Sequence, residues 1–167
     1  MTTETIYNRI RVSDDLLTGG QPTEAELRAA AAEGVRTVIN LATHDPQRSL
    51  PDEAGLVRSL GLSYHHIPVD WGTPTEADFD AFDRLMQSLP PGKLLIHCAA
   101  NFRVTTFYAL YALRRLGWSK AQADAFRARI WQGSNYPIWE AFYARLKARL
   151  TDHTDTPAPG GRSQRRE

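Results

Sequence analysis

The chain has 167 residues, a formal net charge of +1 at pH 7, 42% hydrophobic residues and one cysteine. This length suits one domain with a buried core, and the near-neutral charge gives no reason to expect a nucleic-acid or membrane partner. One cysteine excludes an intrachain disulfide, and no apolar run reaches the ~20 residues that span a membrane. The first residues lack a basic stretch followed by a long apolar one, so we expect a cytoplasmic protein without a signal peptide.

The residues before the cysteine alternate short apolar runs with amphipathic stretches, which is typical of an α/β fold. The β-branched run at 35–41 predicts a buried strand, and further strands are predicted at 10–12, 16–18, 62–69 and 93–97. Helices are predicted to begin at Thr23, near Pro51 and at Thr75. We therefore expect a mainly parallel sheet of four to five strands flanked by helices.

The pattern is helical after the cysteine. One helix ends at Gly117, a capping box at Ser119 opens a second that continues to about Trp131, and a third begins near Pro137. The helix that begins at Thr75 is predicted to have an apolar face of Phe79, Phe82, Leu85 and Met86. The apolar face of the first helix after the cysteine is predicted to consist of Val104, Phe107, Leu110, Tyr111, Leu113 and Leu116. That of the helix from Pro137 is predicted to consist of Ile138, Phe142, Leu146 and Leu150. We expect one domain over 1–150 and a disordered tail over 151–167, where apolar periodicity ends.

The cysteine lies between an apolar strand and an amphipathic helix. Backbone N–H groups and the positive end of a helix meet at such a junction and favour an anion there. The same field favours the thiolate of Cys98, which is the nucleophilic form of cysteine. Arg103 can bind two phosphate oxygens, and Asn101 tolerates the left-handed conformation that a tight anion-binding loop needs. The alternative is an inert buried cysteine beside a surface arginine.

Four segments in order resemble the cysteine-dependent protein tyrosine and dual-specificity-like phosphatases, especially the compact bacterial type. They are Thr18-Gly19-Gly20-Gln21-Pro22-Thr23, Val38-Ile39-Asn40-Leu41, Tyr64-His65-His66-Ile67-Pro68-Val69 and the loop that begins with His97-Cys98. The resemblance covers about residues 17–116 and implies a mainly parallel sheet, no metal or other cofactor, and a phosphocysteine intermediate. It also implies that the loop binds phosphate through Ala99, Ala100, Asn101, Phe102 and Arg103.

The arginine stands one residue earlier than in that family. The family pattern is Cys-x5-Arg, whereas this chain has Cys-x4-Arg with Val104 at the usual arginine position. Asn101 stands where the family has its loop glycine, and Thr105 stands where the family has Ser or Thr. One residue near a helix start is a rotation of about 100°, so we expect Arg103 to approach the anion from a different side.

Cleavage of a phosphate ester also needs a proton donor. The resemblance implies an aspartate after an earlier strand, and Asp70 follows the strand predicted at 62–69. Asp78 and Asp80 are rivals, although carboxylates in a first helical turn commonly stabilise the helix. Glu53 is a more remote candidate.

Two further residues are predicted to support the loop. The resemblance implies that His97 hydrogen-bonds the backbone around the loop and helps to hold the thiolate. Thr105 is expected either to hydrogen-bond Cys98 and assist breakdown of the intermediate or to be an ordinary first-turn threonine. His65 and His66 are adjacent in a predicted strand and point to opposite faces, so we expect no metal site.

The first functional hypothesis is a phosphatase that acts on phosphomonoesters, including phosphotyrosine or other phosphoproteins, with Cys98 as nucleophile, Arg103 as phosphate ligand and Asp70 as general acid and base. Its expected partner is a phosphorylated protein or small molecule. The alternatives are a non-catalytic phosphate-binding module and, because the Cys98-to-Arg103 spacing also occurs in rhodanese-like proteins, a sulfurtransferase.

Overall fold

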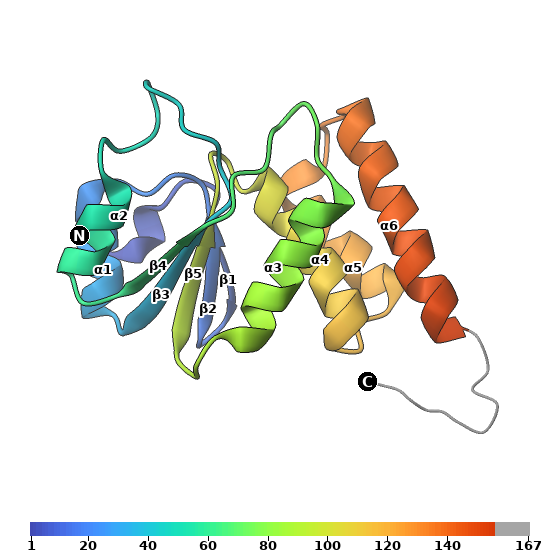
Figure 1. The fold of residues 1–167 in the computed structure, drawn as a ribbon, viewed down its shortest axis with the longest axis horizontal. Helices are drawn as coiled ribbons and strands as arrows, with labels where there is room; N and C mark the ends of the chain where they lie inside the picture. The colour runs from blue at the N-terminus through green and yellow to red at the C-terminus, as the bar shows by residue number, and fades with distance from the viewer. Residues whose placement is uncertain (156–167) are drawn as a thin grey trace. The chain divides into compact units, whose positions relative to one another are not determined.

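A computed structural model describes residues 1–155 and divides the chain into two compact units, residues 1–105 and the residues from Thr106 onward. The first unit contains a 3-10 helix, five strands, three helices and the start of a fourth (Figure 1). In chain order these elements are the 3-10 helix Thr3–Thr5, β1 Ile10–Ser13, β2 Leu16–Gly19, α1 Glu24–Ala32, β3 Val35–Asn40, α2 Glu53–Ser59, β4 Ser63–His66, α3 Glu76–Ser88, β5 Lys93–His97 and α4 Phe102–Arg115.

The five strands form one sheet in the order β1-β2-β5-β3-β4. The β1 strand is antiparallel to β2, and all other neighbours are parallel, which confirms the predicted fold class. Gly19 pairs with His97, His97 with Asn40, and Asn40 with His66. The parallel strands therefore end in one row, and the loops that follow them leave the same edge of the sheet.

Helices cover both faces of this sheet. Figure 1 shows α1 and α2 on one side of the strands and α3 on the other. The core beneath α1 and α2 contains buried apolar residues from both helices and from three central strands, namely Leu27, Ala30, Val57, Leu17, Val35, Val38 and Leu95. On α3, Phe79 and Phe82 are fully buried, whereas Leu85 and Met86 are half-buried. This packing fixes the strand ends relative to one another.

The helix starts agree with the sequence. Reciprocal capping boxes are present at Thr23, Thr75 and Ser119, and Asp52 accepts the N–H of Gly55 at the start of α2. The strand predicted at 62–69 is shorter than expected because Pro68, which lacks an N–H, interrupts its ladder. Beyond the end of β4, Ile67 and Val69 still donate to the carbonyls of Asn40 and Leu41, at 2.9 and 3.0 Å.

The second unit contains the rest of α4, α5 Lys120–Trp131 and α6 Pro137–Asp155. Two residues assigned to apolar faces are exposed instead: Leu116 by 49% and Ile138 by 55%. Both lie at helix ends, and at the start of α6 it is Trp139 that is buried, at 1% exposed. The α6 helix extends past residue 150 to Asp155, so the first five residues of the expected tail are helical and the remaining tail lies outside the described residues. Within residues 1–155 no helix has the length and apolarity to cross a membrane.

Candidate active site

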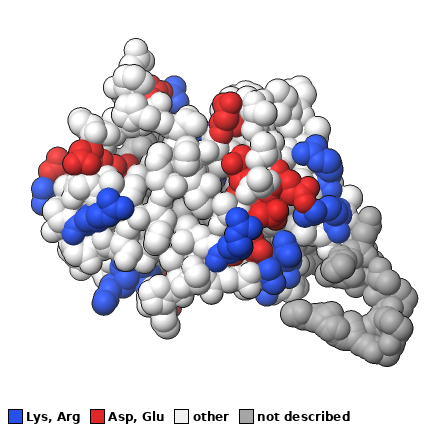
Figure 2. All heavy atoms as spheres, in the orientation of Figure 1, with Lys and Arg blue, Asp and Glu red and all other residues white. Residues whose placement is uncertain are grey.

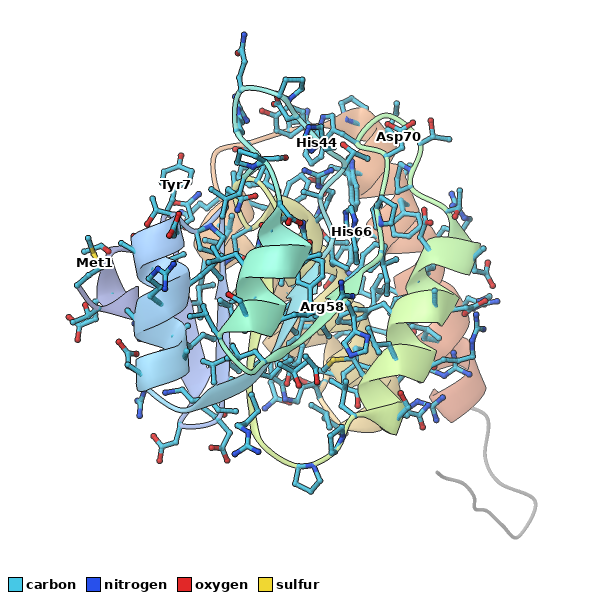
Figure 3. All side chains as sticks on the ribbon, turned by 60° about the vertical axis from the view of Figure 1, so that its left-hand side comes forward. Met1, Tyr7, His44, Arg58, His66 and Asp70 are labelled. Atoms are coloured by element: carbon cyan, nitrogen blue, oxygen red, sulfur yellow. The ribbon has the colours of Figure 1, made fainter. Side chains whose placement is uncertain are left out.

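The candidate site lies at the edge of the sheet where the parallel strands end. In Figure 1 the loops after β3, β4 and β5 all leave the upper end of the sheet. Figure 3 shows His44 and Asp70 at this same end, on the loops after β3 and β4. The loop after β5 begins with Cys98, which is buried with 1% of its surface exposed.

The loop from Cys98 to Asn101 is held by its carbonyl groups. The Ala99 carbonyl accepts the N–H of Gln21 at 3.0 Å, and the Ala100 carbonyl accepts Nδ2 of Asn8 at 3.0 Å. The loop also forms an isolated antiparallel bridge between Ala100 and Gly20, so its backbone is paired with the segment that follows β2. The loop leads directly into the first turn of α4, where backbone N–H groups and the positive end of a helix favour an anion.

Asn101 fixes the shape of this loop. Its φ of 69° is the left-handed conformation predicted for it. Its side-chain Nδ2 donates to the Asn8 carbonyl at 2.8 Å and to Thr18 Oγ1 at 3.0 Å, and its backbone carbonyl accepts the Thr105 hydroxyl at 2.8 Å. Thr105 therefore supports the loop backbone from the first turn of α4. Gly20 allows a further close approach, since a Cβ there would lie 2.6 Å from the Ala99 oxygen.

Arg103 is the second residue of α4 and is 7% exposed. Its Nη1 donates to the Val69 carbonyl at 2.8 Å, and its guanidinium lies 5.8 Å from the centre of the Trp71 ring. Its Nε and Nη2 have no partner among residues 1–155 and are not fully buried. The half-buried ring of Phe102 meets Trp71 edge-on at 6.2 Å. The guanidinium thus joins the cysteine loop to the base of the loop that carries Asp70.

Asp70 itself is exposed, and its Oδ1 accepts the N–H of Gly72 at 3.2 Å. Of its two rivals on α3, Asp78 belongs to the capping box with Thr75, which is the structural role expected of a first-turn carboxylate. Asp80 is half-buried. Figure 2 shows acidic side chains gathered over α3. Of Asp70, Asp78 and Asp80, only Asp70 directly follows Val69, whose carbonyl accepts the hydrogen bond from Arg103.

Glu53 belongs to a different part of the site. Its Oε2 lies 2.5 Å from Nε2 of His97, and its Oε1 accepts Nε2 of Gln21 at 2.9 Å. Nδ1 of His97 lies 3.1 Å from the carbonyl of Cys98, so His97 contacts the loop backbone as the resemblance implies. Both oxygens of Glu53 therefore have partners within the site.

The neighbouring histidines lie side by side in the sequence of β4 and have different surroundings. Nε2 of His66 lies 2.6 Å from the carbonyl of Ala42, and His65 is half-buried on the same strand. Within the described residues, no three side chains of His, Cys, Asp or Glu gather in a way that could hold a metal ion.

Sequence reasoning missed three parts of the site. Asn8 carried no signal, because its partners in the loop lie more than ninety positions away. Gln21 stands in a segment that carries the resemblance, but its contact with Glu53 was not foreseen. The Val69 carbonyl is a backbone group, which no residue pattern distinguishes.

The comparisons with known proteins identify the fold and the family. The structure of PTPMT1 in complex with PI(5)P matches with a TM-score of 0.67 over 87% of this chain and 98% of that one, at 23% identity. The fold is that of the cysteine-based phosphatases. A crystal structure of a candidate phosphatase of the DUF442 family, from Shewanella putrefaciens CN-32, is 30% identical, with a TM-score of 0.77 over 88% of this chain and 95% of that one. This chain belongs to the DUF442 family.

The curated relatives are longer proteins than this chain. The "Beta-lactamase hydrolase-like protein" of Xylella fastidiosa strain Temecula1 is 33% identical over 104 residues, which are 60% of this chain and 24% of the relative. The chain thus spans about a quarter of the length of the curated relatives that it matches. No protein-family model matches the chain.

Proposed function

We propose that this protein is a phosphatase that hydrolyses phosphomonoesters through a phosphocysteine intermediate on Cys98. One observation carries the proposal: the N-terminus of α4 and the buried guanidinium of Arg103 adjoin the single cysteine of the sequence. Membership of a family that includes candidate phosphatases supports the same conclusion.

The phosphate group binds to the amides of the loop that runs from Cys98 to Arg103. Arg103 keeps Nη1 on the Val69 carbonyl and offers Nε and Nη2 to two phosphate oxygens. This division of donors accounts for the early position of the arginine. The Arg103 side chain approaches the phosphate from the side of the loop that carries Asp70. The hydrogen bond of Nη1 to Val69 orients Nε and Nη2.

The reaction has two steps. The Cys98 thiolate attacks phosphorus, so that the P–S bond forms as the P–O bond to the leaving group breaks, and Asp70 gives its proton to the leaving oxygen. Water then attacks phosphorus, Asp70 takes a proton from that water, and the P–S bond breaks to release phosphate and restore the thiolate. Arg103 and the loop amides stabilise the charge on the equatorial oxygens in both steps.

The surroundings of Arg103 support an aromatic phosphate ester as substrate. Trp71 and Phe102 are half-buried and in edge contact, and Trp71 lies beside the guanidinium. Such rings contact an aryl group by stacking or edge contact better than they contact a polar alcohol. Phosphotyrosine in a phosphoprotein and aryl phosphates of small molecules both belong to this class.

Turnover of an aryl phosphate by wild type, Cys98→Ser and Asp70→Asn tests the proposal. We expect no turnover above background for Cys98→Ser and a loss of about 10²-fold or more for Asp70→Asn, the usual contribution of a general acid. Undiminished turnover by Cys98→Ser would exclude the mechanism, and unchanged turnover by Asp70→Asn would exclude only the acid assignment.

Two further results would select the alternatives. Phosphate binding by a wild type without turnover would identify a binding module. Sulfur transfer from thiosulfate to cyanide, in the absence of phosphatase activity, would identify a sulfurtransferase, for which the Cys-x4-Arg spacing is the favouring observation.

A further inference from the structure

An exposed tyrosine lies beside the cysteine loop, and the proposed reaction steps do not use it. Tyr7 is 62% exposed, and within residues 1–105 only Met1 is a more exposed large apolar side chain. Figure 3 shows the Tyr7 side chain at the end of the sheet where His44 and Asp70 also lie. A single exposed ring needs no function by itself, so the argument depends on what holds this ring at the loop.

Gly20 brings the ring of Tyr7 close to the cysteine loop. A Cβ atom on Gly20 would lie 3.0 Å from Cδ2 of Tyr7 and 2.6 Å from the carbonyl oxygen of Ala99, so both groups pack against the same bare backbone. The N–H of Gly20 donates to the Tyr7 carbonyl at 2.7 Å, and Gly20 also forms the bridge with Ala100. Glycine, which has no Cβ, permits this approach of the tyrosine to the loop.

The backbone of Tyr7 is also fixed by the residue that follows it. Asn8 has a φ of 52°, its Nδ2 donates to the Ala100 carbonyl at 3.0 Å, and its own carbonyl accepts Nδ2 of Asn101 at 2.8 Å. These two hydrogen bonds tie the segment that carries Tyr7 to the cysteine loop. Because only two χ angles of a tyrosine remain to be ordered, its contact with a ligand has a low entropic cost.

Tyr7, Ala99 and Ala100 together form a small apolar shelf at the start of the loop. The two alanines are half-buried, so the shelf consists of two methyl groups and an aromatic ring. Trp71, the ring proposed to contact the aryl group, lies beside Arg103 at the end of the loop. A substrate that contacts both Trp71 and the shelf therefore extends beyond a single aryl group.

We propose that Tyr7 is a specificity-determining residue that receives, with Ala99 and Ala100, an apolar side chain next to phosphotyrosine in a peptide substrate. The inference deepens the proposed function and rests on it, since the loop must bind the phosphate before a flanking residue reaches the shelf. A peptide fits because an extended chain places its next side chains about 3.3 Å per residue from the phosphotyrosine. An apolar surface favours an apolar side chain there.

The test compares two phosphotyrosine peptides that carry either leucine or serine on both sides of the phosphotyrosine. Wild type should show a kcat/KM about fivefold higher for the leucine peptide, because partial burial of a leucine side chain favours binding. Tyr7→Ala should abolish this preference, and Tyr7→Phe should retain it, because the ring rather than the hydroxyl makes the contact. Equal kcat/KM values in wild type, or a preference that survives in Tyr7→Ala, would overturn the proposal.

Leu116→Ala is the matched control. Leu116 is also a large exposed apolar side chain, at 49%, but it follows the C-terminal end of α4, whose first turn adjoins the cysteine loop. The length of α4 places it about 20 Å from that first turn. This variant should keep the wild-type preference for leucine, and loss of the preference would contradict the assignment to Tyr7.

Peptide binding to Cys98→Ser separates this proposal from the proposed function. The variant keeps the shelf but lacks the nucleophile, so it should bind the leucine peptide about fivefold more tightly than the serine peptide. That preference, found together with a wild type that turns over neither peptide, would refute the phosphatase function alone. Equal binding of the two peptides, found together with normal turnover by wild type, would refute only the role of Tyr7.

Discussion

Replacement of Asn101 separates the two ways in which this residue shapes the loop. Asn101→Ala should lower the free energy of unfolding by about 3 kcal/mol. Of this, about 1 kcal/mol comes from each hydrogen bond of Nδ2, to Asn8 and to Thr18, and about 1 kcal/mol from the left-handed φ of 69° that alanine resists. Asn101→Gly loses the same hydrogen bonds but adopts this φ freely, so its loss should be about 2 kcal/mol.

Urea unfolding followed by circular dichroism measures both variants. Asn135→Ala, at an exposed loop position before α6, is the control and should change the free energy of unfolding by no more than about 0.5 kcal/mol. The glycine variant should also keep more aryl phosphate turnover than the alanine variant, because it preserves the path of the loop. Equal stability of the alanine and glycine variants would refute the argument from backbone conformation, and a loss no greater than that of Asn135→Ala would refute the argument from hydrogen bonds.

Two other predictions concern charge. Arg103→Lys should lower kcat/KM for an aryl phosphate by about 10²-fold, because an ammonium group cannot bind two oxygens in a fork; turnover equal to wild type would contradict this role. Burial tends to raise the pKa of Asp124, but hydrogen bonds from Tyr143 and Lys147 outweigh it and lower the pKa. A carboxyl group whose pKa is lower in the folded state stabilises the fold at pH values above its pKa in the unfolded state. This stabilisation is lost as the pH falls through the pKa of the folded state. Asp124→Asn should therefore be less stable than wild type at neutral pH, and thermal unfolding should show the deficit vanish in acid; a deficit that is constant with pH would contradict the assignment.

The order of strands and helices was accessible from the sequence because its signals are local. A β-branched run, a capping box at Thr23 and a glycine stop each act within a few residues, so periodicity and caps located every strand and α-helix. The sequence predicts too late an end for β4, because Ile67 and Val69 still donate to Asn40 at the end of β3 and to Leu41 just beyond it, on either side of Pro68, without forming a regular ladder. Leu116 and Ile138 were misassigned because apolar spacing does not show which side of a helix end faces solvent.

The sequence predicts those parts of the candidate site whose residues are close together in the chain. The junction of Cys98, Asn101 and Arg103 could be read as an anion-binding loop because strand, turn and helix adjoin there in the chain. The pairing of Glu53 with His97 spans 44 positions, and the bonds between Asn8 and the loop span 92 and 93. Such contacts follow from the order of strands in the sheet, and no short pattern encodes them.

The proposed reaction transfers the phosphoryl group to the sulfur of Cys98 before water releases it. Trapping this phosphocysteine is the most direct test. Wild type and Asp70→Asn are mixed with an aryl phosphate and quenched in acid during turnover. Each protein is then digested, and the mass of the peptide that contains Cys98 is measured by mass spectrometry. We predict that this peptide gains the mass of one phosphoryl group in both proteins and that the Cys98→Ser control gains none. Release of the aryl alcohol by an enzyme whose Cys98 peptide never carries phosphate at any quench time would contradict the account.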